Sequence, residues 1–344
     1  MVAGVDYEFK GVDFSIFCRS RIKKIIAKNT AKTDLHFTTF DIRKGMVSVL
    51  EVTYPSGNKS EVSSVPNPSK YKSVSKTNYN GKDFKDGQNN IISIVDIYKE
   101  VQNIGLNYPG TLMELSFFSH AWMGGPILVN SYDDGNYTYQ PPPPATTPIT
   151  IALPLGQRDP DDLDPRGYKD FLPPNMSSVG LANFQNAFNT NGFSWIWGCA
   201  FPRDVHEILH KIENHSKYKS SGLVDSEDFN FRNMKSAHVS LISSYLGIVI
   251  SNYKNFTIKF GDLKRFICMI TIASYSQILA NNTKKEVRGG VMGTYSEYDS
   301  GSLPLMHVHK GFAKHFTFYK NYMGFSFDNE GRNYGIYTPN KICP

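Results

Sequence analysis

The stretch ELSFFSHAWMGG, residues 114–125, and its counterpart SWIWGCA, residues 194–200, decide the fold that we expect for this chain. Each is a short apolar run, rich in aromatic and β-favouring residues, that closes beside a glycine, as a buried strand does. The first run ends at His120 and the second at Cys199. In an open α/β sheet, catalytic groups collect at the carboxyl ends of the strands. If the two strands are parallel neighbours, an imidazole and a thiol lie side by side.

The composition is that of a globular protein. In 344 residues, 40% are hydrophobic and 13% aromatic, which is enough for a proper core. The formal net charge is +6, but lysine and arginine are scattered along the chain, so the excess indicates a solvated surface. Since no basic stripe with interleaved aromatic residues is present, we expect no nucleic-acid partner.

The amino terminus lacks the basic start and apolar centre of a signal peptide, and no apolar run is long enough for a membrane span. We therefore expect a cytoplasmic protein, or one that is secreted without a cleavable signal. The cysteines have no close spacing, which indicates free thiols rather than a zinc knuckle or a disulfide framework. They are Cys18, Cys199, Cys268 and Cys343.

Two regions differ in composition. Residues 1–90 form a β-rich amino-terminal portion, with strands expected at 35–42, 46–54 and 61–65, and then a polar surface linker. From residue 91 the pattern is that of an α/β domain that continues to residue 344. A helix expected at 91–104, stopped by Gly105, leads into the His120 strand as in a βαβ unit.

The second region contains a long insertion at residues 132–180, and loops of this length usually serve as lids or binding segments. Beyond the insertion the apolar spacing predicts helices at 181–189, 204–212, 229–252 and 262–281. A further sheet strand is expected at 286–295, and a last one near 334–337. The class expected is therefore α/β with a mostly parallel central sheet.

Cys199 and His120 have the chemistry of a nucleophile and its base. A thiol attacks as thiolate, and a nearby imidazole can take its proton and later protonate the leaving group. Backbone amides must stabilise the oxyanion, and the chain can approach closely at Gly124 and Gly125, or at Gly198. The alternative is that Cys199 is a buried core thiol and His120 a hydrogen-bonded strand-end histidine.

The order of these features resembles the caspase-hemoglobinase clan of cysteine peptidases, including its CHAT-like members. One strand ends in Ser-His and the next in Gly-Cys, and SYSQILANNTKKEVRGGVMGTY follows at residues 274–295. The resemblance covers roughly residues 91–295. It implies a three-layer α/β/α sandwich, a Cys199–His120 dyad without a cofactor, and a peptide or protein substrate. The clan usually has glycine after the histidine, where this chain has Ala121.

A second motif predicts a different chemistry. Residues 206–210 read HEILH, a match to HExxH, which on a helix sets His206 and His210 on one face where they can bind zinc, with Glu207 as the base. The charged Lys211 is atypical of such helices. A zinc metallohydrolase is thus the alternative enzyme.

Two weaker patterns remain. The histidines at 307, 309 and 315 suit a metal site or a second base, but incidental positions are the simpler interpretation. Asp159, Asp161, Asp162 and Asp164 resemble a cation loop without its glycine and glutamate, so a solvated loop is expected. A third functional class also stays open, in which the chain is a non-catalytic binding module, effector or toxin with a secretion-system partner.

Overall fold

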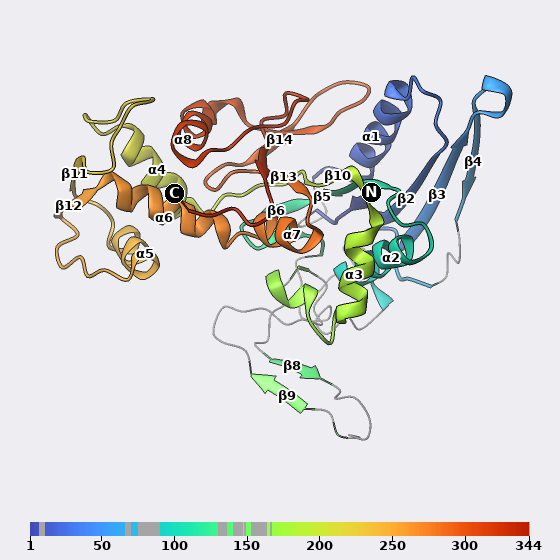
Figure 1. Cartoon of the computed structure of the whole chain (residues 1–344), viewed down its shortest axis with the longest axis horizontal. Coiled ribbons are helices and arrows are strands. Elements are labelled where there is room, and N and C mark those ends of the chain that lie inside the picture. The colour runs from blue at the N-terminus through green and yellow to red at the C-terminus, as the bar shows by residue number, and fades with distance from the viewer. Residues whose placement is uncertain are drawn as a thin grey trace.

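An eight-stranded mixed sheet organises the chain (Figure 1), and its strand order is β16-β13-β10-β5-β1-β2-β3-β4. The computed structural model describes residues 1–6, 11–65, 70–74, 90–129, 136–139, 147, 149–152, 164–165 and 167–343. The strands of the sheet are β1 (Val2–Ala3), β2 (Leu35–Asp41), β3 (Met46–Thr53), β4 (Ser60–Ser64), β5 (Leu112–Phe118), β10 (Phe188–Ile196), β13 (Glu286–Gly289) and β16 (Gly335–Tyr337).

The centre of the sheet is parallel. β1 pairs in parallel with β2 and with β5, and β10 pairs in parallel with β5 and with β13. The outer strands are antiparallel to their neighbours: β16 at one edge, and β4 at the other edge with β3 beside it. The predicted α/β class with a mostly parallel sheet is confirmed. The amino-terminal strands are part of this same sheet, since β1 lies between β2 and β5.

Alternate residues of the central strands face two separate apolar clusters. Val2, Phe117 and Ile196 belong to one cluster, whereas their neighbours Ala3 and Phe118 belong to the other. This alternation is the pleat of strands that are buried on both faces. The layers are therefore helix, sheet and helix, as the predicted sandwich requires.

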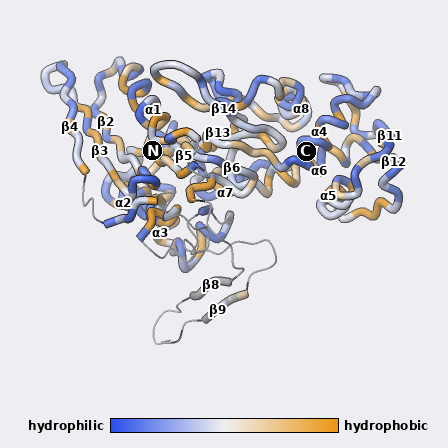
Figure 2. Tube along the Cα trace, turned by 180° about the vertical axis from the view of Figure 1, so that it is seen from behind, coloured by the Kyte–Doolittle hydropathy of each residue, from blue (hydrophilic) through white to orange (hydrophobic). Residues whose placement is uncertain are grey.

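Helices cover the two faces as Figure 1 shows. α2, α3 and α7 lie on one side of the sheet, and α1 and α8 lie on the other. Figure 2 shows the hydrophilic loop between β3 and β4 projecting away from this body. The helices are α1 (Ser15–Lys28), α2 (Ile94–Asn107), α3 (Ser178–Ala187), α4 (Arg203–Glu213), α5 (Ser236–Leu246), α6 (Phe260–Ile272), α7 (Tyr275–Thr283) and α8 (Ala313–Met323).

α2 begins at a capping box, in which the Ser93 side chain and Asp96 satisfy each other's backbone N–H groups. The helix continues through Gly105, where the sequence predicted its end. A Cβ atom at Gly105 would lie 1.7 Å from the carbonyl oxygen of Asn183 in α3. Glycine is thus present because α2 and α3 approach closely, and not because the helix stops.

The helix predicted over residues 229–252 is wrong in its first part. Residues Asp228–Arg232 form β11, which pairs antiparallel with β12 (Asn255–Lys259), and α5 follows. The run Phe229-Asn230-Phe231 alternates with period two, so both phenylalanines are buried on one face of the hairpin. Gly247, in the left-handed conformation, caps α5.

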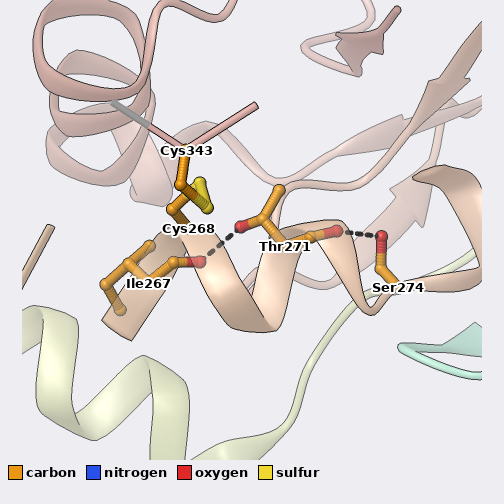
Figure 3. Close-up of a disulfide and its surroundings, with 5 residues drawn as sticks. All are labelled: Ile267, Cys268, Thr271, Ser274 and Cys343. Atoms are coloured by element: carbon orange, nitrogen blue, oxygen red, sulfur yellow. Dashed lines mark hydrogen bonds between the residues drawn. A yellow bond between two sulfur atoms is a disulfide. The ribbon is translucent and has the colours of Figure 1, made fainter. Parts of the chain in front are cut away.

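The helix predicted over residues 262–281 is two helices. α6 ends at Ile272, and Ser274 caps α7 by accepting a hydrogen bond from the Gln277 N–H. The Ser274 hydroxyl also donates to the Thr271 carbonyl, and Thr271 donates to the Ile267 carbonyl (Figure 3). These side-chain hydrogen bonds compete with the helical ladder and break the segment at its serine.

Two of the four cysteines are joined, which corrects the expectation of free thiols. Cys268 in α6 and Cys343 near the carboxyl terminus form a disulfide across 75 residues (Figure 3). The long separation gives no local spacing signal, and this is why the sequence did not predict the pair. Cys18 and Cys199 are free thiols.

The insertion at residues 132–180 is described in part. It contributes the hairpin of β8 (Asn136–Tyr139) and β9 (Ile149–Ala152) and a short turn of 3-10 helix at Gly167–Phe171. Within the described residues, no helix combines the length and the apolar character that a membrane span needs.

Candidate functional site

The strands that deliver His120 and Cys199 are parallel neighbours. β5 and β10 pair in the register Phe117 to Ile196, and the Trp197 N–H donates to the Phe117 carbonyl at 3.0 Å. The pairing ends there, and His120 and Cys199 each follow three residues further along their chains. The carboxyl ends of the two strands therefore bring both segments to one edge of the sheet, as the sequence predicted.

Gly198 maintains the close approach of the two chains beyond the paired strands. A Cβ atom at this position would lie 2.4 Å from the Ala121 Cβ and 2.7 Å from the Ser119 carbonyl oxygen. Any larger residue would force the segment of Cys199 away from that of His120. Glycine is therefore required at position 198 because the chain segments that follow β5 and β10 come into contact there.

A third strand adds a carboxylate. β1 is the other parallel neighbour of β5, and Asp6 follows its end. His120 Nε2 lies 2.6 Å from Asp6 Oδ1, and Phe14 of the segment before α1 stands edge-on to the imidazole, with 5.5 Å between the ring centroids. Asp6 and Phe14 together fix the plane of the ring. A carboxylate that contacts one ring nitrogen is the usual means of orienting a histidine that acts as a base.

Cys199 is half-buried, and its sulfur has a backbone hydrogen-bond donor. The sulfur accepts a hydrogen bond from the Ser296 N–H at 3.3 Å. The hydroxyl of the same serine donates to the Gly198 carbonyl at 2.8 Å. Burial raises the pKa of the Cys199 thiol above its ordinary value, and the Ser296 N–H offsets only part of this increase. In this state Cys199 is a neutral thiol at neutral pH.

The buried Tyr334 supports the turn that carries Cys199. Its hydroxyl contacts the Trp197 carbonyl oxygen and lies 3.2 Å from the Ser296 hydroxyl. Among the described residues, the Cys199 N–H itself has no acceptor, so it is a candidate donor to an oxyanion. The segment is therefore held in place by side chains on either side of the thiol.

Gly124 and Gly125 lie in the turn of a tight hairpin that follows His120. β6 (His120–Trp122) pairs antiparallel with β7 (Gly125–Ile127), and His120 is at the open end, opposite Ile127. The two glycines form the turn at the other end. A Cβ at Gly125, whose φ is +115°, would press on the Tyr275 ring at 2.8 Å. Both glycines are explained by the turn and its packing.

The HExxH residues lie on α4, directly after the Cys199 turn. The rings of His206 and His210 are 6.1 Å apart between centroids, on the same side of the helix. Glu207 points elsewhere and contacts Arg203, Lys235 and His238. The structure therefore separates the glutamate from the two histidines that the motif groups with it.

His206 belongs to a different chain of contacts. Its Nδ1 lies 2.9 Å from His315 Nε2, and His315 Nδ1 lies 2.7 Å from Glu213 Oε1. Glu213 and His315 are buried, and burial and the nearby His315 lower the pKa of His206. This Glu-His-His chain ties α8 to α4.

The weaker patterns of the sequence have structural partners. His307 of β15 (Met306–Val308) contacts Glu297 at 2.9 Å, and His309 caps the short turn that follows. Asp164 is fully buried and accepts from the Leu128 and Val129 N–H groups. Its companions at 159, 161 and 162 lie outside the described residues.

The sequence pattern did not indicate Asp6 or Ser296. β1 has two residues, too few for a recognisable strand, so the position of Asp6 at a strand end is hidden. An acid just after the apolar VAGV run is the one available signal. Ser296 contributes through its backbone N–H, which has no side-chain signature.

Comparisons of the chain with protein-family models, with curated proteins and with solved structures found no match.

Proposed function

We propose that this chain is a cysteine-dependent hydrolase that acts on peptide or protein substrates, with Cys199 as the nucleophile and His120 as the general base and acid. The observation that carries the proposal is the set of neighbouring parallel strands β1, β5 and β10. Their carboxyl ends bear, in spatial order, Asp6, His120 and Cys199. A carboxylate, an imidazole and a thiol in this order can serve as the orienting group, the base and the nucleophile.

The chemistry has two halves. His120 takes the thiol proton as the Cys199 sulfur attacks the substrate carbonyl carbon, and the carbonyl electrons move to oxygen. When the carbonyl forms again, the carbon–nitrogen bond breaks and the amine leaves with the proton from His120. Water, deprotonated by His120, then attacks the thioester, and the thiol returns to Cys199 with release of the acid.

Asp6 is a positioning residue in this proposal. It contacts His120 Nε2, so Nδ1 is the nitrogen that exchanges a proton with the sulfur. The carboxylate also favours the imidazolium that forms once the thiol proton is transferred. This assistance matters here because Cys199 begins as a neutral, half-buried thiol.

One observation favours a second candidate, a non-catalytic binding module with the same fold. The raised pKa of Cys199 and the hydrogen bond from Ser296 also suit a packed thiol without a chemical role. In that case the Asp6–His120 contact serves only to close the end of the sheet. The two candidates differ in whether a substrate is cleaved.

The disulfide bears on where the protein acts. Disulfides persist in oxidising compartments and are rare where glutathione keeps thiols reduced. The Cys268–Cys343 bond thus supports, of the two locations expected from the sequence, secretion without a cleavable signal.

Cleavage of a fluorogenic peptide library tests the function. The proposal is supported if the intact chain hydrolyses a peptide and if Cys199→Ala and His120→Asn do not. The control His36→Asn should keep the activity. His36 is exposed on β2, away from the ends of β5 and β10, so it is a fair control. Cleavage that survives Cys199→Ala but stops with a chelator would instead identify the metallohydrolase, and no cleavage of any peptide would favour the binding module.

A further inference from the structure

A group of potential metal ligands lies between α4 and α5, away from the thiol. Asp204 and Glu207 are three positions apart in the first turns of α4, and His238 is in the first turn of α5. One ligand atom from each lies within 4.8 Å of the others. The two helices pack together, so the group is set by the fold and not by a mobile loop.

His238 is the strongest evidence for a ligand. Its side chain is 0% exposed, and neither ring nitrogen makes a hydrogen bond of acceptable geometry to a described residue. Its Nε2 is at ion-pair distance from Glu207 but without hydrogen-bond geometry. Buried polar groups without a well-formed hydrogen bond are rare and costly, so an imidazole in this state requires an explanation. Nε2 faces the carboxylates of Asp204 and Glu207, and a cation between the three would satisfy it.

The separations fit a metal ion. His238 Nε2 is 3.0 Å from Glu207 Oε2 and 3.4 Å from Asp204 Oδ1. Ligands of a tetrahedral zinc ion, at bond lengths of 2.0–2.1 Å, are separated from one another by about 3.3 Å. Asp204 is half exposed, so the remaining coordination position opens to water.

We propose that Asp204, Glu207 and His238 form a zinc site that is independent of the proposed hydrolase function and shares only Glu207, and neither histidine, with the HExxH motif. One imidazole nitrogen and two carboxylate oxygens are a normal donor set for zinc, with water as the fourth ligand. The buried imidazole disfavours Mg²⁺ and Ca²⁺, which take oxygen ligands.

Glu207 already pairs with two cationic side chains, those of Lys235 and Arg203. The Lys235 ammonium contacts Glu207 Oε2, and Arg203 Nε lies 3.0 Å from Oε1. Both side chains are mostly exposed, 57% for Lys235 and 79% for Arg203, and can turn into solvent. Zinc must displace Lys235, so the removal of this lysine strengthens zinc binding.

Isothermal titration calorimetry with zinc chloride tests the site. The protein is the purified full chain with the substitution Cys199→Ser, which removes a competing thiol. We expect one ion per chain. Asp204→Asn should lower the affinity at least tenfold, because a half-exposed ligand is lost while the fold is kept, and Lys235→Met should raise the affinity. The matched control His210→Asn, which alters the HExxH set alone, should leave the affinity unchanged.

Thermal unfolding with and without zinc supplies a second measurement. Zinc should raise the unfolding temperature of the parent chain and of His210→Asn, and should raise that of Asp204→Asn clearly less at the same zinc concentration. The proposal is overturned if the parent binds no zinc at all. It is also overturned if binding survives Asp204→Asn and disappears in His210→Asn, since the ion would then belong to the HExxH histidines.

Discussion

His120 Nε2 lies 2.6 Å from Asp6 Oδ1, a contact between residues 114 positions apart in the chain. It joins the ends of β1 and β5, and the next parallel strand in the sheet, β10, ends at the Cys199 turn. The contact determines which imidazole nitrogen is directed away from the carboxylate. It also gives the proposed base a counter-charge that a lone strand-end histidine would lack.

Replacement of Asp6 by asparagine should lower kcat for peptide cleavage about a hundredfold, because orientation and charge at the base are both lost. KM should change little, since Asp6 does not contact the substrate in this proposal. Asp13→Asn, a nearby acid that contacts Ser15 instead, is the control. An unchanged kcat in Asp6→Asn would remove Asp6 from the mechanism.

Arg21 should be one of the most sensitive positions for stability. Its buried guanidinium pairs with Glu114 and Glu330 at 2.7 Å each and lies over the rings of Trp195 and Trp197. Arg21→Ala leaves two carboxylates without their partner, and we expect a loss of about 3–5 kcal/mol in the free energy of unfolding.

Urea denaturation measures this loss. Arg19→Ala is the matched control, since Arg19 is exposed on the same helix and contacts only Ser15 among the described residues. Its effect should stay within about 0.5 kcal/mol. If the two substitutions lower the free energy of unfolding equally, the buried ion pairs of Arg21 contribute no more to stability than the exposed Arg19 does.

The same pairs predict an acid-sensitive stability. Burial by itself would raise the pKa of Glu330, but the hydrogen bonds and charge of Arg21 outweigh burial and hold this pKa below its usual 4.5. A carboxyl with a lowered folded-state pKa stabilises the fold above its unfolded pKa. This stabilisation is lost as the pH falls through the folded pKa.

Thermal unfolding between neutral pH and pH values below the usual pKa of Glu330 measures the effect. The intact chain should lose stability more steeply over the acid part of this range than Glu330→Gln, which has no carboxyl to protonate at that position. Parallel curves for the two proteins would show that Glu330 does not contribute.

The disulfide should contribute substantially to stability. Cys268 and Cys343 close a segment of 75 residues, and removal of a bond of this kind costs about 2–4 kcal/mol. Cys343→Ser should lower the unfolding temperature, and dithiothreitol should lower that of the intact chain but not that of the variant. If the reductant lowers both equally, the bond does not form in solution.

The sequence predicted the parts of the fold that rest on strong local patterns. The apolar runs before His120 and Cys199 are β5 and β10, and their parallel pairing follows from the helices between them. Residues 229–252 show where such reasoning fails. In so short a run, the spacing of Phe229 and Phe231 is compatible with both a helix and a strand. The segment is a strand because it pairs with β12.

The remaining features depend on contacts between distant segments. Asp6 approaches His120 only because β1 is inserted between β2 and β5, and no local signal marks a strand of two residues. His238 approaches Asp204 and Glu207 through the packing of α4 on α5, so a motif of consecutive spacing such as HExxH could not have revealed that group. The sequence thus indicated residues that could form a site, and only the fold shows which of them lie together.

The central claim is that His120 activates Cys199, and covalent labelling with a peptidyl acyloxymethyl ketone library tests it most directly. Intact mass spectrometry and peptide mapping should find one adduct per chain, on Cys199, with the buried Cys18 unlabelled. The rate of labelling should fall about a hundredfold in His120→Asn. An adduct rate that is the same in the intact chain and in His120→Asn, or no adduct on Cys199, would contradict the account.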